Sequence, residues 1–151
     1  LEEMKFLSGA CMFFFKKNFD KIGGFDENFF LYFEENDFCL RSHKIYKNYQ
    51  ANNIQIEHNV GQSVKIDNKN EEIKLKNLRS WHFIWSKFYY YKKHYGFLYS
   101  ILYLFPTIIR IHVRICYYSI INNKKNKEKY LIRWSGLISS ILNKKSFKRI
   151  D

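Results

Sequence analysis

The stretch "FFLYFEENDFCLR", residues 29–41, places a row of acidic side chains between two aromatic runs. Glu34, Glu35 and Asp37 stand between flanks that have the composition of a buried core. A carboxylate beside a core costs free energy unless it is paired, bound to a metal or used in chemistry. The rest of the sequence has to account for these carboxylates.

The chain has 151 residues, 46% of them apolar, which is enough to bury the core of an ordinary domain. It begins with Leu1 and enters apolar-rich sequence directly, without a signal-peptide pattern. We therefore expect it to be a piece of a longer protein whose start lies upstream.

The cysteine pattern argues against a metal ribbon or a disulfide framework. The three cysteines, Cys11, Cys39 and Cys116, are far apart and include no CxxC pair. We expect reduced, mostly buried thiols in a cytoplasmic protein.

Charge divides the chain into two different parts. Residues 1–63 carry 7 Lys/Arg against 9 Asp/Glu, a net charge of −2, whereas residues 64–151 carry 19 against 5, a net charge of +14. A basic, aromatic-rich segment is typical of proteins that face nucleic acid or an anionic membrane.

Apolar runs and turn residues predict an α/β order of elements in the first part. Short apolar or alternating runs predict strands over residues 7–15 and 49–58. Apolar residues at helical spacing predict a helix over residues 35–47, with its acidic residues in the first turn, where the helix dipole favours negative charge. Gly23 and Gly24 end a short helical turn.

Three helices are predicted in the second part, over residues 71–95, 97–121 and 124–142. Pro106 is expected to bend or break the middle helix. We place the boundary between the two parts at residues 60–70, in a polar loop.

The middle helix is apolar, but its charges argue against a membrane span. Its uncharged stretch from Tyr95 to Ile109 is 15 residues long, short of the roughly 20 that a span requires. Arg110 and Arg114 are four residues apart and share a face, as in helices that lie in the membrane interface. Packing of the three helices on one another is the alternative, and the two are compatible.

The acidic row has two interpretations. Side chains where a loop enters a helix can project into a cleft, where a carboxylate can serve as a general base. Alternatively, Glu35 and Asp37 only favour the helix start. His58, at the end of a predicted strand, is a candidate metal ligand, although a lone histidine is more often a surface residue. No HExxH, P-loop or GxSxG motif is present.

The order of short motifs over residues 7–63 resembles the C-terminal half of the catalytic domain in family 2 glycosyltransferases of the GT-A fold. The nearest group is similar to bacterial rhamnosyltransferase-like enzymes of surface polysaccharide assembly. The motifs are Gly9-Ala10, Lys16-Lys17, Gly24-Phe25-Asp26-Glu27, the aromatic run 29–33, Glu34-Glu35 with Asp37, Arg41, and His58 followed by Gly61 and Ser63.

The resemblance implies a fold for each part of the chain. Residues 1–65 would form the C-terminal half of a GT-A (nucleotide-diphospho-sugar transferase) domain, of α/β class. Residues 66–151 would form a basic tail of amphipathic helices.

The resemblance also implies roles for individual residues. Glu35 would be the general base, with Glu34 or Asp37 as alternatives because the family more often has Asp at the second acidic position. His58 would bind the divalent metal, Mg²⁺ or Mn²⁺, that neutralises the leaving diphosphate. The acceptor side would be shaped by Gly9, Ala10, Asp26 and Glu27.

The implied reaction transfers a sugar, with inversion, from a nucleotide-sugar donor to a glycan or polyprenyl-diphosphate-linked acceptor. The donor-binding half and its metal-binding D-x-D motif would lie upstream, so residues 1–151 alone should be inactive. The implied location is cytoplasmic and peripheral, on the anionic inner face of the cell membrane, with no nucleic-acid partner. L-rhamnose as the sugar follows from the resemblance alone.

Two other functions remain open. A nucleic-acid-binding module would use the tail's aromatic and basic side chains, but leaves the acidic row and His58 unexplained. A catalytically inactive, membrane-associated scaffold would keep its function without the charge of Glu35.

Overall fold

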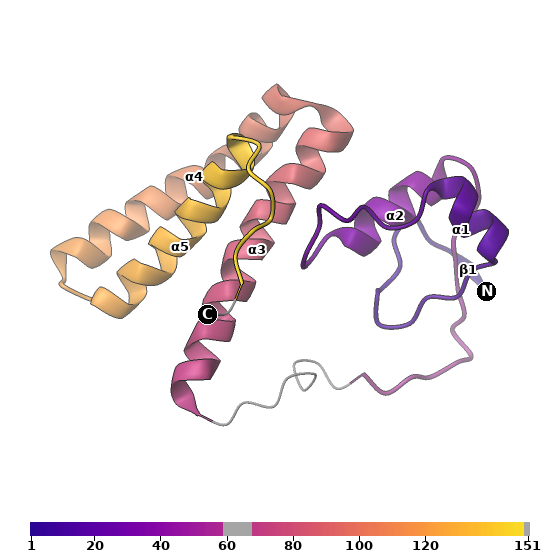
Figure 1. Ribbon diagram of the computed structural model, residues 1–151, viewed down its shortest axis with the longest axis horizontal. Helices are drawn as coiled ribbons and strands as arrows, with labels where there is room; N and C mark the ends of the chain where they lie inside the picture. The colour runs from indigo at the N-terminus through magenta and orange to yellow at the C-terminus, as the bar shows by residue number, and fades with distance from the viewer. Residues whose placement is uncertain (59–67, 150–151) are drawn as a thin grey trace. The chain divides into compact units, whose positions relative to one another are not determined.

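The structure, a computed structural model, describes residues 1–58 and 68–149, of which 61% are helical (Figure 1). These residues form two compact units. The first holds residues 1–29 and 33–58, and the second holds residues 30–32 and 68–149.

The first unit contains two short helices and one short strand pair. Helix α1 spans Lys16–Ile22 and helix α2 spans Glu34–His43. Strand β1, Glu2–Glu3, pairs antiparallel with strand β2, Tyr49–Gln50, and Glu2 lies opposite Gln50.

Phenylalanine rings cluster in this unit around the buried ring of Phe38. The rings of Phe14, Phe19, Phe25 and Phe38 pack with centroids 4.8 to 6.5 Å apart. Each such pair adds about 0.5–1.5 kcal/mol beyond the burial of its apolar area. This aromatic cluster joins the segment before α1, the turn after it and α2.

The glycine pair ends α1 as predicted. Gly23 adopts a left-handed conformation, with φ of 91°, and its N–H donates to the carbonyls of Phe19 and Asp20. Glycine takes this conformation at no steric cost. The predicted helix over residues 35–47 is also confirmed as α2, although α2 ends at His43.

The predicted α/β fold, half of a GT-A domain, is wrong for the described residues. Among them only the four residues of β1 and β2 are in strands. The predicted strand over 7–15 is irregular, with Phe13 91% exposed, and the predicted strand over 49–58 continues past Gln50 as coil with Ile54 and Ile56 exposed. A strand needs a neighbour for its backbone hydrogen bonds. Apart from the β1–β2 pair, neither run has a neighbouring strand among the described residues.

The second unit is a three-helix arrangement, and here the sequence predictions are confirmed to within a few residues. Helix α3 spans Lys69–Tyr95, α4 spans Phe97–Ile120 and α5 spans Lys124–Ile141. Pro106 lies inside α4 without ending it. The helices enclose an apolar core made of Ile84, Phe88, Leu104, Ile111 and Leu137.

Helices α3 and α5 approach closely at a glycine. A Cβ atom on Gly136 would lie 2.6 Å from the carbonyl oxygen of Trp81 and 2.9 Å from Cγ2 of Ile84. Neither distance can accommodate a methyl group, so glycine at this position sets the separation of the two helices.

The segment after α5 runs back along α3 (Figure 1), and a histidine holds it there. His82 is fully buried, and its Nδ1 and Nε2 lie 2.9 Å from the Ser146 hydroxyl and 2.8 Å from the Lys148 carbonyl. The carbonyl can only accept, so Nε2 donates to it and neutral Nδ1 accepts from Ser146. Burial lowers the pKa of His82, and the nearby Arg149 and Lys148 charges lower it further.

Helix α4 is, in the described part of the chain, the one helix that could cross a membrane by length and composition. Its most apolar window has a mean hydropathy of 1.3 and is 17% buried. Core helices of soluble proteins share this composition, so α4 by itself does not place the chain in a membrane.

Candidate functional site

The first unit contains a cavity of about 510 Å³ at the start of α2. Two segments distant in sequence form it, the irregular run before α1 and the first turn of α2. We call it the acidic cavity. It is lined by Gly9, Ala10, Cys11, Met12, Phe14, Phe25, Glu34 and Glu35.

Gly9 lies directly against Glu35. A Cβ atom on Gly9 would be 3.3 Å from the Glu35 Cβ and 3.4 Å from its Cγ. Because Gly9 has no side chain, the backbone of this segment can approach the Glu35 side chain closely. The structure thus brings together Gly9, Ala10, Glu34 and Glu35, four of the residues that the sequence singled out.

A buried asparagine fastens the run that leads to Gly9 onto α2. The Asn48 amide donates to the carbonyls of Lys5 and Cys39, at 3.2 and 3.1 Å, and its Oδ1 accepts from the Ser42 hydroxyl at 2.8 Å. The Met4 N–H donates to the Asn48 carbonyl at 2.9 Å. These bonds tie Met4 and Lys5 to α2 and so help to position the wall of the cavity that contains Gly9.

Glu34 combines a buried carboxylate oxygen with a perturbed pKa. Its Oε2 is buried and, among the described residues, has no hydrogen-bond partner. Burial raises the pKa of Glu34, outweighing the backbone hydrogen bond that lowers it, and the charge of Glu35 raises it further. A carboxylate whose pKa is raised can accept a proton from a molecule bound in the cavity.

The backbone is strained immediately before this acidic pair. Tyr32 and Phe33 adopt left-handed conformations, with φ of 67° and 71°. Each costs a residue with a side chain roughly 1–2 kcal/mol. These two left-handed residues direct the chain into α2, so Glu34 and Glu35 occupy the first turn of that helix, beside the cavity.

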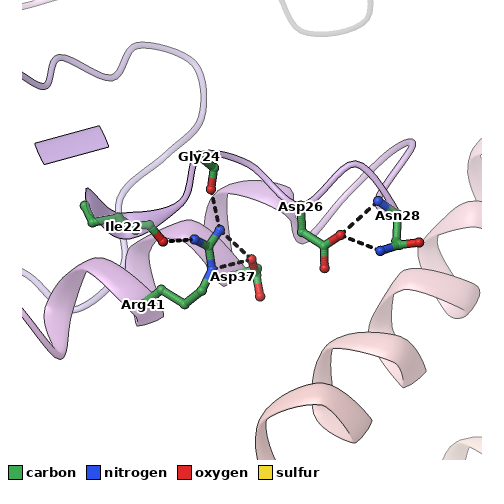
Figure 2. A network of polar contacts seen from close by, with 6 residues as sticks. All are labelled: Ile22, Gly24, Asp26, Asn28, Asp37 and Arg41. Atoms are coloured by element: carbon green, nitrogen blue, oxygen red, sulfur yellow. Dashed lines mark hydrogen bonds and ion pairs between the residues drawn. The ribbon is translucent and has the colours of Figure 1, made fainter. Parts of the chain in front are cut away.

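Asp37, the third candidate base, serves as an ion-pair partner instead of lining the cavity. Its side chain is fully buried, and its Oδ2 accepts from Arg41 Nε at 2.9 Å and pairs with Nη2 at 2.8 Å (Figure 2). Arg41 also donates to the carbonyls of Ile22 and Gly24, at 2.7 and 2.6 Å. The pair therefore links α2 to the end of α1 and its glycine turn.

The two predicted acceptor-side acids lie outside the cavity lining. Asp26 Oδ1 accepts from the backbone N–H and side-chain amide of Asn28, at 2.9 and 2.7 Å (Figure 2), which stabilises the turn after Gly24. Glu27 is exposed. Phe25, just before them, supplies the lining residue from this turn.

His58 is exposed at the end of the described part of the first unit. No group of three or more His, Cys, Asp or Glu side chains that could hold a metal occurs in residues 1–58 and 68–149. Gly61 and Ser63, which follow His58 in the motif, lie outside the described residues. A metal at His58 therefore stays a prediction.

The expectation that the cysteines are mostly buried is wrong. Cys11, in the cavity lining, and Cys116, on α4, are exposed, and only Cys39 is buried. Burial raises the pKa of the Cys39 thiol. The lining role of Cys11 was missed because neighbouring apolar residues predicted a buried strand there.

Comparison with protein-family models, with characterised proteins and with solved structures finds no match to this chain.

Proposed function

We propose that this chain supplies the acceptor side of a glycosyl transfer reaction. The sugar, with L-rhamnose as the first candidate, moves from a nucleotide-diphosphate donor to a glycan or polyprenyl-diphosphate-linked acceptor. One observation carries the proposal. The segment of Gly9 and Ala10 and the pair Glu34-Glu35, about 25 residues apart in the sequence, line one cavity.

The acidic cavity suits a sugar hydroxyl that must lose a proton. The carboxylate takes the hydroxyl proton while the acceptor oxygen bonds to the anomeric carbon and the bond to the diphosphate breaks. The oxygen attacks from the face opposite the leaving group, so the configuration inverts. Phe14 and Phe25 supply apolar surface beside the carboxylates, against which a sugar ring can lie.

We assign the base to the acidic pair, with Glu34 as the first choice. A general base works best with a pKa near the working pH, and burial raises the pKa of Glu34 toward that range. Its buried Oε2 has no hydrogen-bond partner among the described residues. The family resemblance favours Glu35 instead, and the two assignments predict different mutants to be inactive.

The divalent metal stays part of the proposal without a described site. His58 is the one ligand we assign to this chain, and Mg²⁺ or Mn²⁺ would there neutralise the leaving diphosphate. The described residues form no metal cluster of their own. We therefore derive no step of the transfer from the metal.

We place the protein on the cytoplasmic side of the cell membrane, bound peripherally to its anionic surface. The net charge of +14 over residues 64–151 supports this location, since each Lys or Arg near such a surface contributes about 1 kcal/mol.

A transfer assay on the full-length protein, in membranes of the cells that produce it, tests the proposal. Labelled nucleotide sugars, Mg²⁺ or Mn²⁺ and a lipid-diphosphate sugar acceptor are supplied to the wild type and to Glu34→Gln and Glu35→Gln. We expect the base variant to lose about 10²–10⁴-fold in kcat. Glu128→Gln, an exposed change on α5, is the matched control and should keep wild-type activity.

The two single variants separate the assignments. If Glu34→Gln loses transfer activity and its pH–rate profile no longer falls at low pH, Glu34 is the base. If only Glu35→Gln loses transfer activity, Glu35 is the base. Transfer unaffected by either variant refutes a base in this cavity, and absence of transfer from every donor favours the inactive scaffold.

A further inference from the structure

Helix α4 has an apolar face that the second unit leaves uncovered. Its core face carries Ser100, Leu104 and Ile111, all buried. On the opposite side, the apolar residues are 47% to 84% exposed. This outer face consists of Leu98, Leu102, Phe105, Ile109, Val113 and Ile120, together with exposed Cys116.

The outer face is a continuous stripe. Its members recur every three or four residues from Leu98 to Ile120, so they lie above one another along one side of the helix. At 1.5 Å per residue the stripe is about 33 Å long. A contiguous exposed apolar surface of this kind marks an interaction site in a protein.

Polar-tipped side chains line one flank of the stripe. The exposed rings of Tyr95, Tyr99 and Tyr103 follow one another with centroids 5.1 and 5.9 Å apart. Arg110 and Arg114 continue the same flank and are exposed. Tyr and Arg combine an apolar body with a polar tip, and they are enriched where hydrocarbon meets headgroups.

We propose that α4 lies in the plane of an anionic bilayer, with the outer face immersed at the boundary of headgroups and acyl chains. Tyr99, Tyr103, Arg110 and Arg114 then reach the headgroups from the flank. The proposal deepens the membrane association put forward above by naming the surface that carries it.

Charge selects the membrane over a second copy of the chain. Helix α4 contains no acidic residue, and residues 64–151 carry 19 Lys/Arg against 5 Asp/Glu. Two copies that paired through α4 would bring Arg110 and Arg114 of each chain near the other without a carboxylate on α4 to neutralise them. Phosphate groups of anionic lipid provide that neutralisation.

The packing of α4 selects an in-plane orientation over a crossing one. Leu104 and Ile111 are enclosed within the core shared with α3 and α5. Helix α5 begins with Lys124 and Lys125, and its first turns also contain Lys127 and Lys129. Surrounding α4 with lipid would require stripping it from this core or carrying those charges into hydrocarbon, whereas immersion of the outer face requires neither.

Vesicle binding of the 151-residue chain tests the proposal independently of any transfer activity. The chain is mixed with phosphatidylcholine vesicles containing 30% or no phosphatidylglycerol, and the bound fraction is measured by co-sedimentation. We expect the anionic vesicles to bind at least tenfold more tightly, with weaker binding at high salt. The double variant Leu102→Glu with Ile109→Glu should bind at least a hundredfold more weakly, at roughly tenfold or more per lost apolar side chain.

A matched variant controls for added charge. Ile73→Glu with Leu131→Glu introduces the same two carboxylates at partly exposed apolar positions on α3 and α5. It should bind anionic vesicles much more tightly than the α4 variant does. Circular dichroism before each titration confirms that the three helices remain folded.

Cys116 provides a direct probe because it lies within the outer face and is exposed. A polarity-sensitive fluorophore is attached to it in the Cys11→Ser background, since Cys39 is buried. Anionic vesicles should shift its emission to the blue and brighten it, and nitroxide-labelled lipids should quench it. The same fluorophore on Leu131→Cys, with Cys11 and Cys116 both replaced by serine, should respond much less.

Three results would overturn the proposal. The first is that the two α4 substitutions have no specific effect: the α4 variant binds vesicles as tightly as the wild type, or both double variants lose the same amount of vesicle binding. The second is an unchanged Cys116 emission in the presence of bound vesicles. The third is that the wild type sediments as a dimer without lipid while the α4 variant sediments as a monomer, since a second copy would then cover the outer face. If the chain binds vesicles but the full-length protein transfers no sugar in the assay above, the proposed reaction alone is refuted.

Discussion

The buried ion pair Asp37–Arg41 should hold the first unit together, and Asp37→Asn tests this. The change keeps the shape of the side chain and removes its charge. The neutral amide oxygen then replaces the carboxylate as the acceptor for Arg41, whose side chain is only 20% exposed. Charge-assisted hydrogen bonds contribute about 1.5–3 kcal/mol, so we expect a loss of about 2–3 kcal/mol in the free energy of unfolding of this unit.

The same helix spacing and distance occur in an exposed pair, which serves as the control. Lys16 and Asp20 are also four residues apart, 2.9 Å between charged atoms against 2.8 Å for Asp37–Arg41, but their side chains are 86% and 54% exposed. Water screens such a pair, so Asp20→Asn should cost no more than about 0.5 kcal/mol. The difference in burial is the main reason why the two expected losses differ.

Amide hydrogen exchange measures the effect in the right part of the molecule. The three tryptophans, Trp81, Trp85 and Trp134, all lie in the second unit, so their fluorescence follows that unit. Protection of the α2 amides should fall about 30- to 150-fold in Asp37→Asn, with unchanged fluorescence-detected unfolding. If Asp37→Asn costs no more than Asp20→Asn, the pair does not stabilise α2 and Asp37 becomes a candidate base again.

Three further changes test other parts of the structure. Gly136→Ala gains about 1 kcal/mol of helix propensity but forces a Cβ to 2.6 Å from the Trp81 carbonyl oxygen. Urea unfolding followed by fluorescence should therefore show a net loss of about 1 kcal/mol in the free energy of unfolding. A net gain in this free energy would mean that α5 can move away from α3. The pKa of His82 is lowered by burial, so the unfolded chain takes up a proton below about pH 6.5 that the folded chain does not, and the free energy of unfolding should fall as the pH drops below that value. His82→Gln should flatten this dependence, and an unchanged slope would contradict the neutral, buried assignment. Gly9→Ala pushes against Glu35 at 3.3 Å and should lower transfer activity about tenfold with little change in melting temperature, and full activity would show that the cavity tolerates the shift.

The helices could be predicted from the sequence because their signals are local. Apolar residues at helical spacing indicate α3, α4 and α5, and Gly23 marks the end of α1. These features depend on residues a few positions apart, so they can be read without knowledge of the rest of the fold.

The strands could not be predicted reliably because a strand depends on distant partners. The run that ends in Phe13, Phe14 and Phe15 has strand composition, yet all three side chains are exposed and only Phe14 packs in the aromatic cluster. Ile54 and Ile56 alternate as strand residues do and are also exposed. Local composition does not reveal whether a neighbouring strand is available.

The acidic cavity could be predicted in part. The motif order pointed to Gly9, Ala10, Glu34 and Glu35 together, and these four share the lining. The sequence also suggested Asp37, whose pairing with Arg41 becomes visible only in the fold. Asn48 was missed because its partners, Lys5, Cys39 and Ser42, meet only after folding.

The close contact between α3 and α5 also limits which mutations the second unit can tolerate. Gly136, Ser139 and Ser140 are buried on the same side of α5, and small residues at such spacing let helix backbones approach closely. In a saturation library selected for folded protein, these three positions should keep glycine, alanine or serine, with Gly136 the most restricted. Exposed positions of α5 such as Leu131 should instead accept nearly any helix-forming residue.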